Sequence, residues 1–156
     1  SRSLIFNAIL SERVASGTWN TAIAGEVCML EGTHSVFRND QVDAALQERI
    51  ASGDVHPTGP MWGEGDRLVS NEAAALEMRV AQTYPVFTRG LEAARLTAAR
   101  RALRLPVPDL RWQSENERTL TLEFFLPAGA YATTVLRELV EIENPAGGVN
   151  HDVEED

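Results

Sequence analysis

The sequence has 156 residues, 44% of them hydrophobic, and a formal net charge of -9. This length suits one globular domain or two small lobes that share a core. No apolar run approaches the roughly 18 to 20 residues that a membrane helix needs, and a single cysteine excludes a disulfide framework. We therefore expect a folded protein of the reducing cytoplasm, without a membrane partner.

The first third of the chain predicts a helix, two strands and a second helix. Apolar residues at helical spacing indicate a helix over residues 3–15. Its expected apolar face consists of Leu4, Ile5, Ala8 and Val14. Residues 25–30 and 34–37 are typical of short strands joined by a tight turn. The pair Asn39-Asp40 is then expected to cap the second helix.

Residues 54–66 contain two prolines and three glycines. This composition predicts an ordered loop without regular secondary structure. Its glycines form neither a dinucleotide-binding nor a Walker sequence. Trp62 could stack on a nucleic-acid base, but an aromatic residue in such a loop more often packs its own loop onto the core.

Two further helices are expected over residues 72–84 and about 87–98, separated by Pro85, which disfavours helical conformation at the residue before it. The apolar period then changes to that of a strand over residues 103–107. We place the boundary between two structural units near Leu103.

The remaining sequence predicts a strand over residues 119–124, a Pro/Gly turn and a final helix. Phe124 is in phase with the apolar positions of this strand, so we expect it in the core, whereas Phe125 would face the other side. The helix has an apolar stripe and carries Tyr131 at its first turn. The stripe consists of Ala132, Val135, Leu136 and Leu139.

Every cation in the chain is an arginine, and one segment is rich in them. Its members are Arg89, Arg95, Arg100, Arg101, Arg104 and Arg111. The planar guanidinium group suits bidentate contact with phosphate. For the pair Arg100-Arg101, phosphate contact and a solvated or salt-bridged face remain equal alternatives.

The histidines show no metal-binding pattern. His34, His56 and His151 lie far apart, and neither of the first two has a carboxylate or imidazole at helical ligand spacing. We expect no metal site.

The segment over residues 124–139 reads Phe-Phe-Leu-Pro-Ala-Gly-Ala-Tyr-Ala-Thr-Thr-Val-Leu-Arg-Glu-Leu. It closely resembles the C-terminal motif of the tRNA pseudouridine synthase D (TruD) family, with Ala130 where the family commonly has serine. Other segments resemble the family in the same order, and the likeness covers about residues 1–142. These segments are residues 3–13, 53–60, 92–103 and 110–112.

The resemblance implies an α+β fold with mixed helices and short antiparallel strands. Residues 1–104 would form a TruD-type insertion domain. Residues 105–143 would form a strand-strand-helix piece of a larger catalytic sheet, and residues 144–156 an acidic, disordered tail.

The family's chemistry, as the resemblance implies it, is the isomerisation of uridine 13 of tRNA to pseudouridine without metal or cofactor. The base must be flipped out of the RNA, and an aspartate acts as the nucleophile. In the family this aspartate lies in an N-terminal half that the resemblance places outside this chain. We therefore expect no catalytic residue here and an inactive fragment.

The resemblance assigns substrate contacts to Tyr131 and Gly129, with Tyr131 as a stacking wall for uracil. Without it, a half-buried cap over Leu126 would be the simpler role of Tyr131. Arg100, Arg101 and Arg104 are candidate RNA contacts. The expected partners are tRNA and the missing half of the catalytic domain.

Two other classes of function stay open. The chain could be a non-catalytic RNA-binding module that uses the arginine-rich segment, with Tyr131 or Trp62 as a stacking platform. It could also be a protein-interaction domain, in which the exposed half of a split core forms an oligomer.

Overall fold

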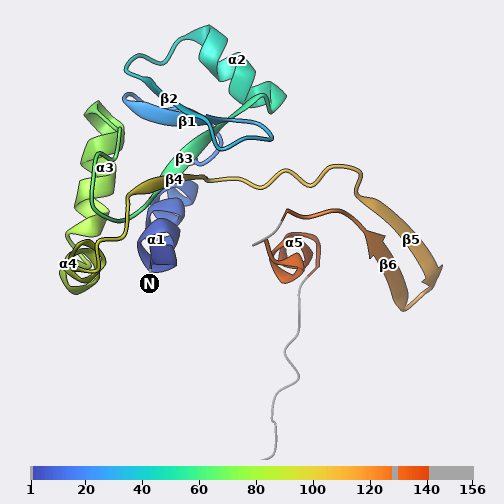
Figure 1. Cartoon of the computed structure of the whole chain (residues 1–156). Helices are drawn as coiled ribbons and strands as arrows, with labels where there is room; N and C mark the ends of the chain where they lie inside the picture. Colours follow the sequence, from blue (N-terminus) through green and yellow to red (C-terminus); the bar gives the residue numbers. More distant parts are fainter. Residues whose placement is uncertain (1, 128–129, 141–156) are drawn as a thin grey trace, which may run out of the picture. The chain divides into compact units, whose positions relative to one another are not determined.

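The computed structural model describes residues 2–127 and 130–140. The chain divides into two compact units, Ser1–Pro106 and Val107–Asp156, and Figure 1 shows the elements of each. The described residues form five helices, a four-stranded antiparallel sheet and a two-stranded antiparallel sheet. The predicted α+β class is therefore confirmed.

The first unit is built on an antiparallel sheet with the strand order β2-β1-β3-β4. The predicted hairpin near the N-terminus is present, with Cys28 of β1 opposite Phe37 of β2. On its other side, Cys28 lies opposite Pro57 of β3. The strands are β1 (Glu26–Leu30), β2 (Val36–Asn39), β3 (Val55–Met61) and β4 (Ala99–Ala102).

The prediction of a loop over residues 54–66 is wrong for the first half of this range. That half forms the interior strand β3. The ladder with β1 involves only residues 55–57, and the ladder with β4 only residues 58–61. Each half of β3 is thus paired on one side, so its two prolines are tolerated although they lack an N–H group. The sequence predicts a strand over residues 103–107, but the strand in this part of the chain is β4, which ends at Ala102.

Four helices accompany this sheet: α1 (Arg2–Ala15), α2 (Ala44–Ser52), α3 (Asn71–Ala81) and α4 (Pro85–Ala93). The start expected for the second helix is wrong, because Asn39 belongs to β2. Asp43 is the cap, and its Oδ1 accepts a hydrogen bond from the Leu46 N–H at 2.7 Å. α4 ends before residue 98, and Arg95 has a positive φ of 53°.

The expected apolar face of α1 is partly wrong. Ile5, Phe6 and Ile9 are buried, whereas Val14 is 55% exposed. The position one turn after Ile9 is occupied by Arg13, which is only 2% exposed. Arg13 can occupy this buried position because its guanidinium group forms an ion pair with Glu26.

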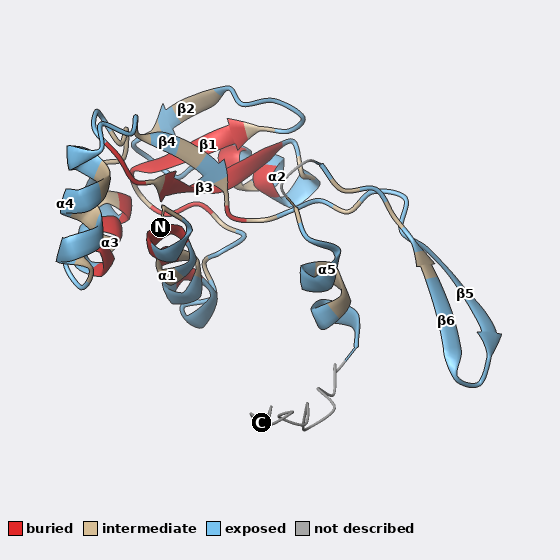
Figure 2. Cartoon of the chain, turned by 60° about the horizontal axis from the view of Figure 1, so that its bottom comes forward, coloured by how far each residue is buried: buried red, intermediate tan, exposed pale blue. Residues whose placement is uncertain are grey.

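The core of the first unit consists of two clusters. One gathers Ile5, Ile9, Trp62, Val80 and Ala81, and the other Ala22, Cys28, Leu46, Ile50 and Val55. Figure 2 shows the buried residues concentrated in β1, β3 and the helix faces that cover them. Trp62 packs onto the core, as expected for an aromatic residue in a loop of this composition. Its Nε1 donates a hydrogen bond to Glu92 Oε1 at 3.1 Å. It therefore offers no stacking platform.

The second unit consists of the hairpin β5 (Arg111–Asn116) and β6 (Thr119–Glu123), and the helix α5 (Ala132–Leu139). The last predicted strand and helix are confirmed. Phe124 is half-buried and Phe125 is 73% exposed. The expected disordered tail over residues 144–156 lies outside the described residues.

No helix in the described part of the chain is both long and apolar enough to cross a membrane.

Candidate functional site

Tyr131 is the N-cap residue of α5 and has an extended backbone, with φ -116° and ψ 123°. Its carbonyl oxygen accepts a hydrogen bond from the Thr134 N–H at 3.0 Å. The side chain is 72% exposed, so it does not form a half-buried cap over Leu126. The other substrate contact that the resemblance implies, Gly129, lies outside the described residues.

Tyr131 is one of several large apolar side chains that the second unit leaves exposed. The others are Leu110, Trp112, Leu120, Phe125, Leu139 and Val140. The whole of β5 is exposed, as Figure 2 shows. A two-stranded hairpin of this kind is marginally stable alone, and an apolar surface of this extent is typical of an interface. The unit therefore presents an extended apolar surface, and its place in a larger core stays a prediction.

Arg100, a candidate RNA contact, is held inside the first unit. Its Nη1 lies 2.8 Å from Glu77 Oε1, and both side chains are at most 4% exposed. Its Nε donates to Thr58 Oγ1 at 2.9 Å, and its Nη2 to the Thr58 carbonyl at 2.8 Å. These contacts use the donors that a phosphate would need, so Arg100 serves the fold in this state.

Arg104 is also engaged by protein groups. Its Nε donates to His56 Nδ1 at 2.7 Å, and its Nη2 donates to the carbonyls of Val55, at 2.8 Å, and Ile50. Because His56 Nδ1 accepts, Nε2 is free to donate to the Glu31 carboxylate. This chain of contacts ties the segment after β4 to the start of β3.

Arg101 differs from its two neighbours because its residue is exposed. Alternation along β4 directs it away from Arg100. Its guanidinium carbon lies 5.7 Å from the centre of the Phe6 ring. Of the three candidate arginines, only Arg101 is presented to a ligand, and its contact with RNA stays a prediction.

A second buried ion pair joins Arg13 Nη1 to Glu26 Oε2 at 2.7 Å. Burial raises the pKa of the Glu26 carboxyl, and the Arg13 charge opposes this rise. Burial likewise raises the pKa of Glu77, against the effect of Arg100. One oxygen of each carboxyl, Glu26 Oε1 and Glu77 Oε2, is buried without a hydrogen-bond partner.

Sequence reasoning missed both buried pairs. The signal for Arg13 was its spacing, because residues 5, 9 and 13 share one helix face. Glu77 gave no comparable signal, since a charged residue in an alanine-rich helix is usually solvated. Its partner is 23 residues away in sequence.

The aspartates of the first unit all have structural partners. Asp40 accepts from Ser70 Oγ at 2.8 Å, Asp43 caps α2, and Asp54 pairs with Arg49 at 2.6 Å. Asp66 accepts from the Leu68 N–H and pairs with Arg38; the first contact is the main reason that its pKa is lowered. Each of these four carboxylates thus has a role in the fold, and the absence of a catalytic residue from this chain stays a prediction.

The described residues hold no cluster of three or more histidine, cysteine, aspartate or glutamate side chains that could bind a metal ion. Cys28 is buried, and desolvation raises its pKa to about 12. Its thiol is therefore protonated and unreactive at neutral pH.

Comparison with known proteins connects these features. Residues 1–139 match the family model described as tRNA pseudouridine synthase D (TruD). A relative from Methylococcus capsulatus, named tRNA pseudouridine synthase D, is 43% identical over 143 residues, which are 92% of this chain and 40% of the relative. A protein of the same name from Xanthomonas axonopodis pv. citri is 45% identical over 158 residues, 100% of this chain and 42% of the relative.

A crystal structure described as a putative tRNA pseudouridine synthase D (TruD) from Methanosarcina mazei has a similar fold, with a TM-score of 0.67 and 25% sequence identity. The match covers 88% of this chain and 36% of that one. The chain thus spans about two fifths of the length of the curated relatives that it matches.

Proposed function

The chain belongs to the tRNA pseudouridine synthase D family, and we propose that it is part of an enzyme that isomerises uridine 13 of tRNA to pseudouridine. The match over residues 1–139 supports the reaction class. The position in the tRNA is the finer part of the proposal, because it comes from the family resemblance.

The reaction breaks the bond between ribose C1′ and uracil N1 and forms a bond from C1′ to C5. N1 gains a proton and C5 loses one, so the atoms balance without an oxidant or a cofactor. The target base must leave the RNA stack to expose this bond. In this proposal the attacking aspartate lies outside the chain, in accordance with the structural roles of the four aspartates described above.

Tyr131 is proposed as a wall that stacks on the flipped uracil, and Gly129, two residues earlier in the sequence, is proposed as a second substrate contact. The observation that carries this proposal is the 72% exposure of Tyr131 at the N-cap of α5, within the segment that most closely resembles the family motif. A buried aromatic could not offer its face to a base. Stacking of this kind contributes about 1 to 3 kcal/mol.

The second unit is proposed as one piece of the catalytic core, completed by the rest of a protein more than twice as long. Its exposed apolar side chains and its open β5–β6 hairpin support this. The hairpin offers unpaired backbone groups to a further strand. The chain alone is accordingly inactive.

A graft tests the activity. Residues 1–139 of this chain would replace the matching segment of the Methylococcus capsulatus relative, and pseudouridine formation would be measured on an unmodified tRNA transcript. Activity at position 13 is the expected result. A folded graft that makes no pseudouridine, beside an active parent, would refute the proposal.

The same graft tests whether Tyr131 stacks on the uracil. Tyr131→Ala should lower the rate about 5-fold to 150-fold, which corresponds to about 1 to 3 kcal/mol of lost stacking, whereas Tyr131→Phe should retain most of it. Phe87→Ala removes another exposed aromatic, from α4, and serves as the control. An unchanged rate with Tyr131→Ala would leave the reaction class intact but remove Tyr131 from the site.

The two other classes have their own signatures. If the chain is a non-catalytic RNA-binding module, it should bind tRNA, and the folded graft should form no pseudouridine. A protein-interaction domain would form a stable oligomer and show no measurable affinity for RNA.

A further inference from the structure

We propose that one edge of the first unit, formed by Arg95 and Arg101, contacts the phosphate backbone of the tRNA. We refer to these two residues as the arginine edge. The inference rests on the proposed function, because it names the surface of the insertion unit that holds the same substrate.

The arginines of the first unit differ in their partners. Five form ion pairs with carboxylates: Arg13, Arg38, Arg49, Arg79 and Arg100. Arg104 is enclosed by His56 and backbone carbonyls. Arg67 lies over the Trp62 ring. Arg89, Arg95 and Arg101 are exposed, and none of the three forms an ion pair within the described part of the chain. Arg89 belongs to α4 and donates to the Pro85 carbonyl, whereas Arg95 and Arg101 belong to the segment that leads into β4 and forms it.

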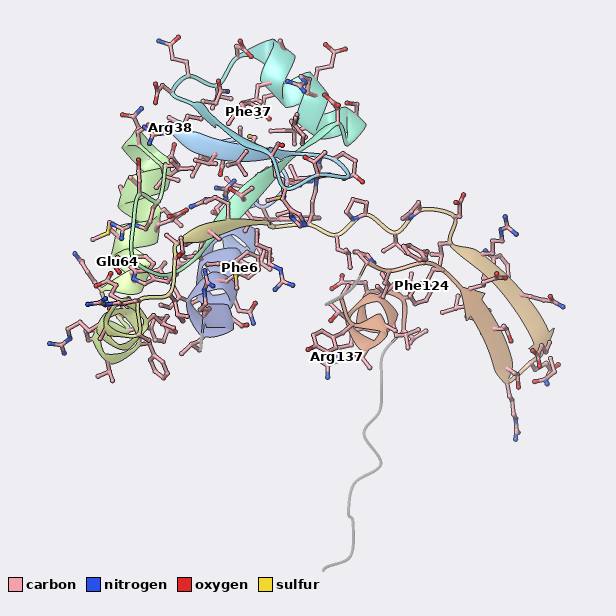
Figure 3. The ribbon with its side chains drawn as sticks, viewed as in Figure 1. Phe6, Phe37, Arg38, Glu64, Phe124 and Arg137 are labelled. Atoms are coloured by element: carbon pink, nitrogen blue, oxygen red, sulfur yellow. The ribbon has the colours of Figure 1, made fainter. Side chains whose placement is uncertain are left out.

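The segment from Arg95 to Arg101 runs along one side of the unit. Ala99–Ala102 is the edge strand of the sheet, and Arg101 projects from it over Phe6, which Figure 3 labels at α1. Arg2 reaches the same segment, since its Nη2 donates to the carbonyls of Thr97 and Met61, both at 2.8 Å. Chain geometry limits the distance between the Arg95 and Arg101 Cα atoms to about 20 Å.

Among the described residues, the acidic groups next to this edge form no ion pair with Arg95 or Arg101. Glu92 accepts a hydrogen bond from Trp62 Nε1, which occupies one of its oxygens. Glu64 is exposed, and its backbone pairs with Leu96 and Ala98, yet among the described residues it forms no ion pair with an arginine. Figure 3 shows Glu64 nearer α4, to one side of Phe6.

RNA fits this edge better than an acidic protein does. The guanidinium groups are spread along an extended segment, as a nucleic-acid backbone requires, and their planar forks match phosphate oxygens. Arg101 over Phe6 is also held by a cation–π contact, so little side-chain entropy remains to be lost on binding. An exposed charge of this kind gains most of its binding energy by releasing counterions from RNA.

The test compares two double variants with the same loss of charge. Arg95→Ala with Arg101→Ala removes two cations from the arginine edge. Arg38→Ala with Arg49→Ala is the matched control, because both of these arginines are exposed and paired, and Arg38 lies on β2, at the opposite edge of the sheet from β4. Arg100→Ala is unsuitable, since it would disturb the buried pair with Glu77.

Binding of the 156-residue chain to an unmodified tRNA transcript would be measured by fluorescence anisotropy from about 50 to about 200 mM salt. The arginine-edge variant should bind about 10-fold or more weakly, and its salt slope should fall by about 2. The control should match the wild type. Equal affinity and equal slopes for the two double variants would overturn the inference.

Two further outcomes are decisive. Absence of tRNA binding by the wild-type chain also overturns the inference, because the arginine edge lies wholly within the compact first unit. A polyglutamate peptide that displaces tRNA at equal charge concentration would show a general polyanion surface and reject RNA recognition. Failure here leaves the graft's pseudouridine formation untouched, so the inference and the proposed function fail separately.

Discussion

Arg100 Nη1 lies 2.8 Å from Glu77 Oε1, in a place where both side chains are almost completely buried. The contact joins β4 to α3 across the first unit and turns a candidate RNA-binding arginine into a part of the core. It also makes the stability of the unit depend on charged groups that the sequence does not distinguish from surface residues.

Removal of one partner should therefore be costly. Glu77→Ala or Arg100→Ala leaves an uncompensated buried charge, and we expect a loss of about 3 to 5 kcal/mol in the free energy of unfolding. Urea unfolding measures the change. Arg49→Ala breaks an exposed pair with Asp54 and should cost less than about 1 kcal/mol. A similar small loss at both sites would contradict the structural role of the buried pair.

The buried carboxyl groups of Glu26 and Glu77 predict how the stability of the first unit changes with pH. Burial raises the pKa of Glu26 and Glu77 above the ordinary 4.5. Above that pH, the folded state therefore holds more protons than the unfolded state, and this contribution to stability decreases as the pH rises through the raised values.

Unfolding free energies measured at increasing pH above 4.5 would show this decrease. Glu77→Gln removes one titrating group, so the variant should be less stable overall and have a flatter pH profile. A wild-type profile that falls with pH no more steeply than that of the variant would contradict the raised pKa of Glu77.

Two glycines provide a test of close packing. A Cβ at Gly63 would lie 2.0 Å from the Leu96 carbonyl oxygen, in the bridge that links residues 64 and 97. We expect Gly63→Ala to destabilise the chain by about 2 to 3 kcal/mol. Gly90 lies in α4 with open space around its Cβ position, so Gly90→Ala should stabilise by about 0.5 to 1 kcal/mol. Thermal melts of the two variants should move in opposite directions.

The division at Pro106 predicts that the two units differ in autonomy. Residues 1–106 contain both core clusters, so a chain ending at Pro106 should retain a cooperative unfolding transition. The segment from Val107 has only a hairpin and one helix among its described elements, and should not fold by itself. Circular dichroism and amide dispersion in NMR spectra measure both. Loss of the cooperative transition on truncation would show that the units share one core.

The exposure of Tyr131 separates its role in the site from any role in stability. Because the side chain is 72% exposed, Tyr131→Ala should change the free energy of unfolding by less than about 0.5 kcal/mol. Ile5→Ala, at a fully buried position, should cost about 2 to 5 kcal/mol. A large stability loss from Tyr131→Ala would assign it to packing.

Local sequence patterns predicted the elements whose signals are local. The hairpin of β1 and β2, the helix α1 and the helix α5 follow from period, turn residues and caps. Pattern reasoning failed at β3, since two prolines and a glycine normally exclude an interior strand. Only the staggered partners β1 and β4 make that strand possible.

The sequence by itself determined the family, the α+β class and the motif that carries Tyr131, because these depend on residue identity and short-range spacing. The tertiary structure alone decided which arginines face solvent. Arg100 and Arg101 are neighbours in sequence, yet alternation along β4 sends one to a buried carboxylate and the other to the surface. The reason is physical: a buried charge needs a partner, and Glu77 comes into reach only when α3 packs beside the sheet.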